Sequence, residues 1–264
     1  MEKRRTKLGK AIAIFNQKGG VGKTTTNINL AACLAIKGKK VLVLDIDPQG
    51  NTTSGLGIDK RNLEYSTYDL LTEDDIDTKK AILNTSTKGL DIIPASVSLA
   101  GAEVELVSVK GREKKLKKAL AKVKKNYDYI FIDCPPSLGL LTINSLTAVD
   151  SVLIPIQCEF YALEGVAQLM STIDIVKKNL NSKLKIEGVI LSMFDGRTNL
   201  SIQVVEEVKK YFKEKVYTTV IPRNVRLAEA PSYGLPIAEY DPKSSGAEAY
   251  REFAEEFLNN EGEK

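Results

Sequence analysis

Short runs of apolar residues recur along the chain, and most are followed by a polar or glycine-containing segment and a helical pattern. Strands are expected at residues 11–15, 41–44, 90–94, 129–132, 151–156, 186–193 and 216–221. Helices are expected at 99–109, 162–180, 201–212 and 245–258, after a first helix that ends at Gly38 and a short one near 68–71. Apolar runs without polar alternation are typical of strands covered on both faces. The pattern therefore predicts an α/β protein with a doubly wound, mainly parallel sheet flanked by helices.

The pattern continues along the chain without a long polar linker or an internal repeat. We expect a single domain over residues 10–260, preceded by a flexible basic arm at 1–9. The chain has 264 residues and is 43% hydrophobic, so it can bury a substantial core. No apolar run approaches the roughly 20 residues that cross a bilayer, and the arm lacks the apolar core of a secretory signal. We therefore expect a soluble cytoplasmic protein.

The composition limits the chemistry that the chain can perform. There are no histidines, so the commonest general base and metal ligand is absent. Cys33, Cys134 and Cys158 are scattered and form no C-x-x-C pair, which argues against a disulfide framework or a zinc site. The formal net charge of +4 permits contact with nucleic acid but does not require it. Catalysis must therefore rest on carboxylates, lysines, backbone dipoles and a hard cation.

The most informative stretch, NQKGGVGKTTT, follows the first predicted strand. Gly19, Gly20 and Gly22 allow a tight turn that exposes backbone N–H groups. These groups and the positive end of the following helix dipole form an anion-binding site. Lys23 can reach the β- and γ-phosphates of a nucleotide, and the Thr24 hydroxyl can ligate Mg²⁺. The stretch therefore predicts a phosphate loop.

The loop departs from the usual pattern G-x-x-x-x-G-K-[ST] at its first glycine. Gln17 stands at that position, and Lys18 adds a second lysine at the start of the loop. The variant K-G-G-V-G-K-T resembles the deviant Walker A motif of the ParA/MinD ATPases. In that family the early lysine crosses a dimer interface to the partner's nucleotide, and the resemblance implies the same role for Lys18.

Two predicted strands are followed by acidic residues at the sheet edge where α/β proteins bind ligands. Asp133 ends the strand at 129–132 in the Walker B pattern, whose acid holds Mg²⁺ through water. Asp45 and Asp47 follow the strand at 41–44. For Asp45, a structural role and an outer-shell contact to Mg²⁺ both stay open.

The resemblance extends over nearly the whole chain and indicates the chromosomal ParA (Soj-type) proteins. It rests on the segments NQKGGVGKTTTNINLAACLA, LDIDPQGNTTSGLG, YIFIDCPPSLGLLTINSL, IPIQCEFYALEG and IPRNVRLAEAPSYGLPI. It implies catalytic roles for Lys18, Lys23 and Asp47, of which Asp47 orients the attacking water. The phosphate-binding residues that it implies are Lys18, Gly19, Gly20, Val21, Gly22, Lys23, Thr24 and Thr25. It also implies adenine binding at Pro222 and Asn224, Mg²⁺ at Thr24 and Asp133, and DNA binding at Arg197 and Arg226 with Arg223 as a neighbour.

Proteins of this family couple ATP binding to dimerisation, non-specific DNA binding and partner-stimulated hydrolysis. The resemblance therefore implies a Mg²⁺-dependent DNA-segregation ATPase that is weakly active alone. It would form a homodimer with ATP, bind double-stranded DNA on the nucleoid and respond to a ParB-type partner. The alternative is a MinD-like ATPase that cycles on membranes. A basic amphipathic C-terminal helix would favour that alternative, whereas EAYREFAEEFLNNEGEK is net acidic.

A basic stretch between Lys110 and Lys125 has apolar residues at helical spacing. One face of this expected helix packs, and the rest of its surface is lysine. A solvated face is favoured over a DNA contact.

Overall fold

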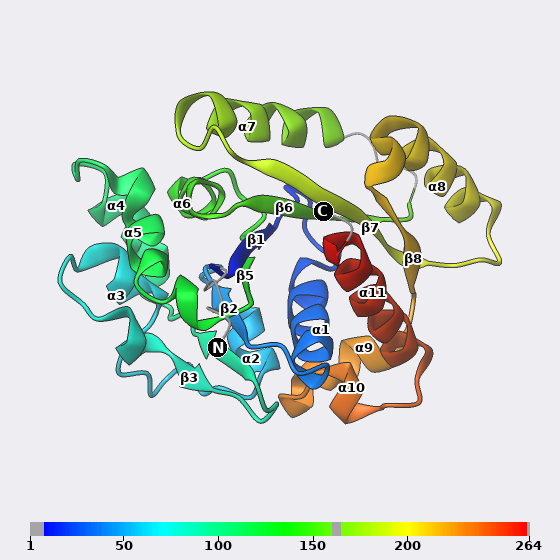
Figure 1. Ribbon diagram of the computed structural model, residues 1–264, viewed down its shortest axis with the longest axis horizontal. Coiled ribbons are helices and arrows are strands. Elements are labelled where there is room, and N and C mark those ends of the chain that lie inside the picture. Colours follow the sequence, from blue (N-terminus) through cyan, green and yellow to red (C-terminus); the bar gives the residue numbers. More distant parts are fainter. Residues whose placement is uncertain (1–7, 160–164, 263–264) are drawn as a thin grey trace, which may run out of the picture.

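The computed structural model describes residues 8–159 and 165–262. Within them, one eight-stranded sheet has the order β3-β4-β2-β5-β1-β6-β7-β8 (Figure 1). Its strands are β1 (Lys10–Ile14), β2 (Val41–Asp45), β3 (Leu83–Asn84), β4 (Leu90–Ile93), β5 (Tyr129–Asp133), β6 (Ser151–Gln157), β7 (Lys185–Phe194) and β8 (Val216–Pro222). Every neighbouring pair is parallel except β3 and β4. The predicted doubly wound, mainly parallel sheet is confirmed.

Helices connect the strands and cover both faces of the sheet. The α-helices are α1 (Lys23–Ile36), α2 (Asn51–Gly55), α3 (Thr67–Thr72), α4 (Leu99–Glu105), α5 (Lys115–Ala121), α6 (Leu140–Ala148), α7 (Val166–Asn179), α8 (Asn199–Phe212), α9 (Val225–Glu229), α10 (Ile237–Tyr240) and α11 (Ser245–Gly262). Short 3₁₀ turns are η1 (Thr78–Ala81), η2 (Arg112–Lys114), η3 (Lys124–Asn126), η4 (Lys213–Lys215) and η5 (Ala230–Tyr233). None of the helices in the described part of the chain is both long and apolar enough to span a membrane.

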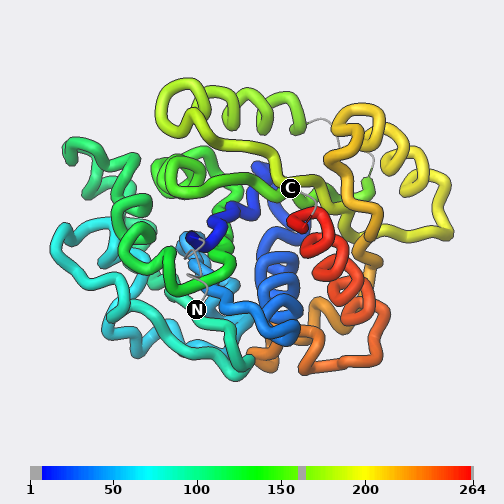
Figure 2. The backbone as a smooth tube through the Cα atoms, in the orientation of Figure 1, coloured from blue at the N-terminus to red at the C-terminus, as the bar shows by residue number. Residues whose placement is uncertain are grey.

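Each face of the sheet has its own hydrophobic core, because alternate residues of a strand point to opposite faces. In β1, Ala11 and Ala13 join the core under α3 to α8, whereas Ile12 and Ile14 join the core under α1 and α11. Figure 1 shows α7 and α8 on one side of the sheet and α1 and α11 on the other. In Figure 2, α1 and α11 run side by side. Burial on both faces explains why the strands are continuous apolar runs.

Several elements differ from the sequence-based expectation. The helix predicted at 99–109 ends as α4 at Glu105. The helix predicted between Lys110 and Lys125 is divided into η2, α5 and η3, and Gly111 adopts a left-handed φ of 71° before it. The hydrophobic pattern does not predict α2 and β3, because these two elements are too short to show a period.

Two expectations fall partly on residues that the structure does not describe. The first residues of the helix predicted at 162–180 lie outside the described part. Within the described part, this helix is α7 and begins at Val166. Residues 1–7 of the predicted flexible arm also lie outside it. At Gly9 the chain already forms a hydrogen bond, in which its N–H donates to the Lys124 carbonyl over 3.2 Å.

The topology brings the candidate residues to one edge of the sheet. Strand β1 lies between β5 and β6, so the chain order reverses there. Ligands of doubly wound proteins bind at such a switch point, outside the carboxyl ends of the strands. The loops that follow β1, β2 and β5 carry the phosphate loop and the candidate acids to this edge.

Candidate active site

The phosphate loop joins β1 to α1 through a tight turn. Gly20 and Gly22 have left-handed φ values of 76° and 87°, which glycine adopts without the clash of a Cβ. Gly22 caps α1, and no side chain caps the helix. The first N–H groups of α1 are therefore free to bind an anion. On the far side of the loop, the Ser192 hydroxyl donates to the Val21 carbonyl over 2.8 Å and anchors the turn to β7.

Lys23 crosses the inside of this loop. Its side chain is buried at 7% exposure, and its Nζ donates to the Lys18 carbonyl over 2.8 Å. Burial lowers the pKa of Lys23, and the nearby Asp133 carboxylate opposes this effect. An ammonium group in such a place gains most from an anionic partner, because burial has removed its water. Lys23 is thus positioned to bind a phosphate.

Oxygen ligands for a divalent cation meet beside Lys23. The Thr24 and Thr52 hydroxyls both donate to Asp133 Oδ2 over 2.7 Å. The other carboxylate oxygen, Asp133 Oδ1, is buried and accepts no hydrogen bond from any described residue. Burial raises the pKa of this carboxyl, so a neighbouring positive charge would be stabilising. Hydroxyl and carboxylate oxygens are the donors that Mg²⁺ prefers, and the site fits that ion.

The two acids after β2 have different surroundings. The Asp45 carboxylate is fully buried and accepts hydrogen bonds from the Thr53 N–H (2.8 Å) and hydroxyl (2.7 Å). Asp47 is partly exposed at the sheet edge, and its Oδ1 accepts from the Gln49 N–H over 3.0 Å. These contacts support the structural role for Asp45, because its carboxylate holds the start of α2 against β2. The Asp47 carboxylate lies near enough to Lys23 to favour the charged form of that lysine.

Gln17 and Lys18, where the loop departs from the usual pattern, contact residues that follow β6. Gln17 donates to the Thr172 hydroxyl of α7 over 2.9 Å, so the side chain that replaces glycine anchors the loop. The Lys18 N–H donates to Asn16 Oδ1 over 3.0 Å. The Lys18 ammonium forms an ion pair with Glu159, and both side chains are more than a third exposed. Lys18 therefore lies on the rim of the loop, whereas Lys23 lies inside it.

A pocket of about 330 Å³ opens beside the start of α1. Its lining includes Gly22, Thr25, Met193, Pro222, Asn224 and Tyr250. Pro222 ends β8, and the Asn224 side-chain oxygen caps α9 by accepting from the Leu227 N–H over 3.3 Å. The structure thus places the two predicted adenine residues next to the phosphate loop, although they lie some 200 positions away in the sequence.

The three predicted DNA-binding arginines follow two neighbouring strands. Arg197 comes after β7, and Arg223 and Arg226 come after β8. Their side chains are exposed. Arg197 forms an ion pair with Asp195 (2.7 Å), which lowers the pKa of that carboxyl to about 2. Arg226 pairs with Glu229 over 2.8 Å. Exposed pairs of this kind are weak, so both guanidinium groups can exchange their carboxylate for a phosphate.

Sequence reasoning missed several residues of the site. Thr52 contacts Asp133, Glu159 contacts Lys18, and Met193 lines the pocket in a left-handed conformation with φ 52°. Non-glycine residues with positive φ are uncommon and concentrate at functional sites. Thr52 and Glu159 lie inside segments that carry the family resemblance, but no local pattern distinguishes them from other polar residues.

Comparisons with known proteins agree with this geometry. Residues 9–186 match a family model described as an AAA domain. The sporulation initiation inhibitor protein Soj of Bacillus subtilis (strain 168) is 64% identical over 96% of this chain and all of its own length. The chromosome partitioning protein ParA of Myxococcus xanthus (strain DK1622) is 53% identical over 97% of this chain and 90% of its own.

A similar solved structure is cobyrinic acid a,c-diamide synthase from Mycobacterium smegmatis with bound ADP and magnesium. It has a TM-score of 0.85 and 40% identity, and the match covers 97% of this chain and 96% of that one. The identity to the partition proteins is higher, and they match over a similar share of the chain. The chain therefore belongs to the ParA/MinD family of P-loop ATPases and, within it, to the Soj-type chromosome-partitioning ATPases.

Proposed function

We propose that this partition ATPase works as an ATP-bound homodimer that binds double-stranded DNA without sequence preference. A ParB-type partner then stimulates hydrolysis, which is slow without it, and the dimer separates. The observation that carries this proposal is the contrast between two lysines of one loop. Lys23 is buried inside the phosphate cradle, while Lys18 lies on its rim, where a second subunit can approach.

The cofactors are ATP and Mg²⁺. In the proposed complex, the N–H groups of residues 19–25 and the Lys23 ammonium bind the phosphates, and Pro222 and Asn224 lie beside the base. Thr24 and Asp133 would hold Mg²⁺, and hydrolysis depends on it. The ion supplies charge neutralisation for the phosphates. The unsatisfied, buried Asp133 Oδ1 supports this assignment.

Asp47 orients the attacking water in this proposal. Phosphoryl transfer needs positioning and charge stabilisation more than it needs a strong base. Asp47 suits that role because it is exposed to the site, whereas the Thr53 contacts already occupy the Asp45 carboxylate. No histidine is available for the task.

Dimerisation requires Lys18 to change its partner. In the single chain its ammonium is paired with Glu159. In the dimer it would exchange this carboxylate for the phosphates of the other subunit's ATP, which carry more charge. ATP would thus act as the link between the two subunits.

DNA binding uses Arg197, Arg223 and Arg226 in this proposal. Guanidinium groups suit phosphate contacts because they are always charged and bind two oxygens at once. Dimerisation doubles the number of these contacts, and affinity for DNA rises steeply with the number of phosphates neutralised. DNA binding therefore depends on ATP, and it places the protein on the nucleoid.

The proposal is tested by sedimentation with random duplex DNA or with acidic liposomes, with and without ATP. We expect DNA binding only with ATP.

Asp47→Ala should bind ATP and DNA but turn over ATP at least about 100-fold more slowly, because the water is no longer positioned. Arg226→Glu should dimerise with ATP and lose DNA.

Three results would contradict this reading. Faster turnover in Asp47→Ala would exclude the role of that residue. An unchanged DNA interaction in Arg226→Glu would place the DNA surface elsewhere. Binding to liposomes instead of DNA would favour the MinD-like alternative.

A further inference from the structure

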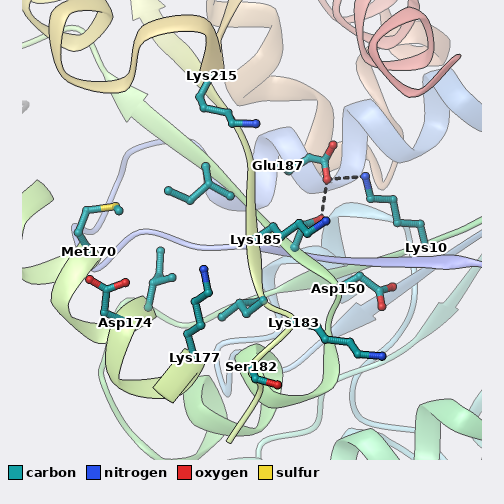
Figure 3. A pocket seen from close by; sticks show the side chains of 14 residues that line it. Lys10, Asp150, Met170, Asp174, Lys177, Ser182, Lys183, Lys185, Glu187 and Lys215 are labelled. Carbon is teal, nitrogen blue, oxygen red and sulfur yellow. Dashed lines mark hydrogen bonds and ion pairs between the residues drawn. The ribbon is translucent and has the colours of Figure 1, made fainter. Parts of the chain in front are cut away.

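A second concave surface lies at the opposite edge of the sheet, where the parallel strands begin. It has a volume of about 940 Å³ and lies between α7 and the starts of β6, β7 and β8. Four lysines from three segments surround it, as Figure 3 shows: Lys177, Lys183, Lys185 and Lys215. We call this surface the lysine groove. No part of the ATPase site described above uses it.

The charges in the groove do not cancel. Two of its carboxylates already have basic partners: Glu187 pairs with Lys10 over 2.5 Å (Figure 3), and Asp150 pairs with Lys124 over 2.6 Å. The remaining carboxylate is Asp174 on α7. The four lysines are exposed, and none of them pairs with a described carboxylate. Among the described residues, the lining holds five lysines and three carboxylates, so the groove has an excess of two positive charges for a ligand.

The base of the groove is apolar. Met170 and Ile173 of α7 and Leu184 and Ile186 near the start of β7 contribute to its lining. Leu184 and Ile173 are buried, while Ile186 and Met170 remain partly exposed. A ligand can thus place apolar groups on the base while its acidic groups reach the lysine rim.

A smaller cavity of about 480 Å³ continues the groove. It shares Lys10 and Asp150 with the first cavity. It adds two lysines and two carboxylates to the lining, so the excess of positive charge stays in the first cavity: Lys39, Lys124, Asp128 and Glu261. Together the two cavities follow the sheet edge past the starts of β5, β1, β6 and β7. An elongated ligand fits this shape better than a small one.

We propose that the lysine groove docks an acidic, amphipathic peptide segment of a partner protein. Complementary charge would guide and orient the segment, and the apolar base would hold its hydrophobic side chains. Among the residues that the structure describes, the lining contains no arginine and one aromatic residue, Tyr129. Nucleic acid is disfavoured, because it lacks apolar side chains for the base and is usually bound by arginine forks and stacked aromatics.

The probe for a test is a fluorescein-labelled peptide of about 14 residues in which glutamate and leucine alternate. Fluorescence anisotropy measures its binding to the full-length protein without nucleotide. The groove variant is Lys177→Glu with Lys183→Glu. The control variant is Lys178→Glu with Lys209→Glu, which changes the net charge equally at exposed positions outside the groove lining. Both variants should keep their ATPase rate and circular dichroism spectrum.

The groove variant should weaken peptide binding about 10-fold, and the control variant by less than about 3-fold, because close charges contribute more than distant ones. Replacing the leucines by serines should also weaken binding by wild type. Equal weakening by both variants, no binding by wild type at millimolar peptide, or no effect of the serines would overturn the proposal. A loss of duplex DNA binding in the groove variant with unchanged peptide binding would also overturn it and indicate a nucleic-acid surface.

Discussion

The two edges of the sheet both gather positive charge, but they hold it in different ways. At the carboxyl edge, Lys23 is buried at 7% exposure, and α1 adds uncapped N–H groups beside it. At the amino edge, the lysines of the groove are exposed and reach it from three segments. A charge that is fixed and desolvated distinguishes one ligand geometry from another, whereas exposed charges attract any anion of suitable shape.

The difference follows from how parallel strands are connected. A strand that leads into a helix at the carboxyl edge leaves free N–H groups pointing at the ligand. At the amino edge, the chain arrives from helix C-termini, whose dipole attracts cations such as lysine. Lys177 in the last turn of α7 is an example. The first edge therefore suits phosphate chemistry, and the second suits docking.

The largest expected effect comes from removing the fixed charge. Lys23→Ala should weaken ATP binding about 100-fold, or about 3 kcal/mol, because a buried charge-assisted hydrogen bond is lost. Lys23→Arg should not restore binding, because a planar guanidinium group does not reproduce the compact ammonium donor that contacts the Lys18 carbonyl. Lys183→Ala at the other edge should leave ATP binding unchanged. Titration with a fluorescent ATP analogue measures all three. Normal ATP affinity in Lys23→Ala would show that the buried charge at the carboxyl edge does not hold the nucleotide.

A second test separates the inside of the loop from its rim. A Cβ added at Gly19 meets no atom within 4 Å, so Gly19→Val should fold and bind ATP within about 3-fold of wild type. The valine should nevertheless block the close approach of a second subunit, and ATP should no longer produce dimers. Light scattering with and without ATP measures the mass. Dimers in this variant would contradict the proposed interface.

The smallest expected effect concerns the rim lysine. Glu159→Gln keeps the shape of the side chain but removes the charge that pairs with Lys18. Exposed ion pairs contribute at most about 1 kcal/mol, so the ATP concentration for half-maximal dimerisation should fall by up to about 5-fold. Glu206→Gln on α8 is the matched control and should change nothing. A higher ATP requirement in Glu159→Gln would mean that Glu159 supports the dimer instead of competing with it.

The sequence predicted the fold well because its signals are local. Buried parallel strands are apolar runs, and the turn from β1 to α1 needs glycines wherever it occurs. Short elements were less predictable. Neither α2 nor β3 has enough residues to show a period. The basic segment that predicted one helix forms α5 with a short 3₁₀ turn on either side, η2 and η3, and its apolar spacing does not show these breaks.

The sequence by itself determined that the chain forms a phosphate loop with a second lysine, because residues 17–24 act through their own backbone and spacing. Tertiary structure alone decided which partners these residues have. Thr52 reaches Asp133, Glu159 reaches Lys18, and Asn224 reaches the pocket beside Thr25 only after β1, β2, β5, β6 and β8 have assembled into one sheet. The lysine groove is decided in the same way. Contacts between distant segments depend on strand order, and local hydrophobic patterns do not encode that order.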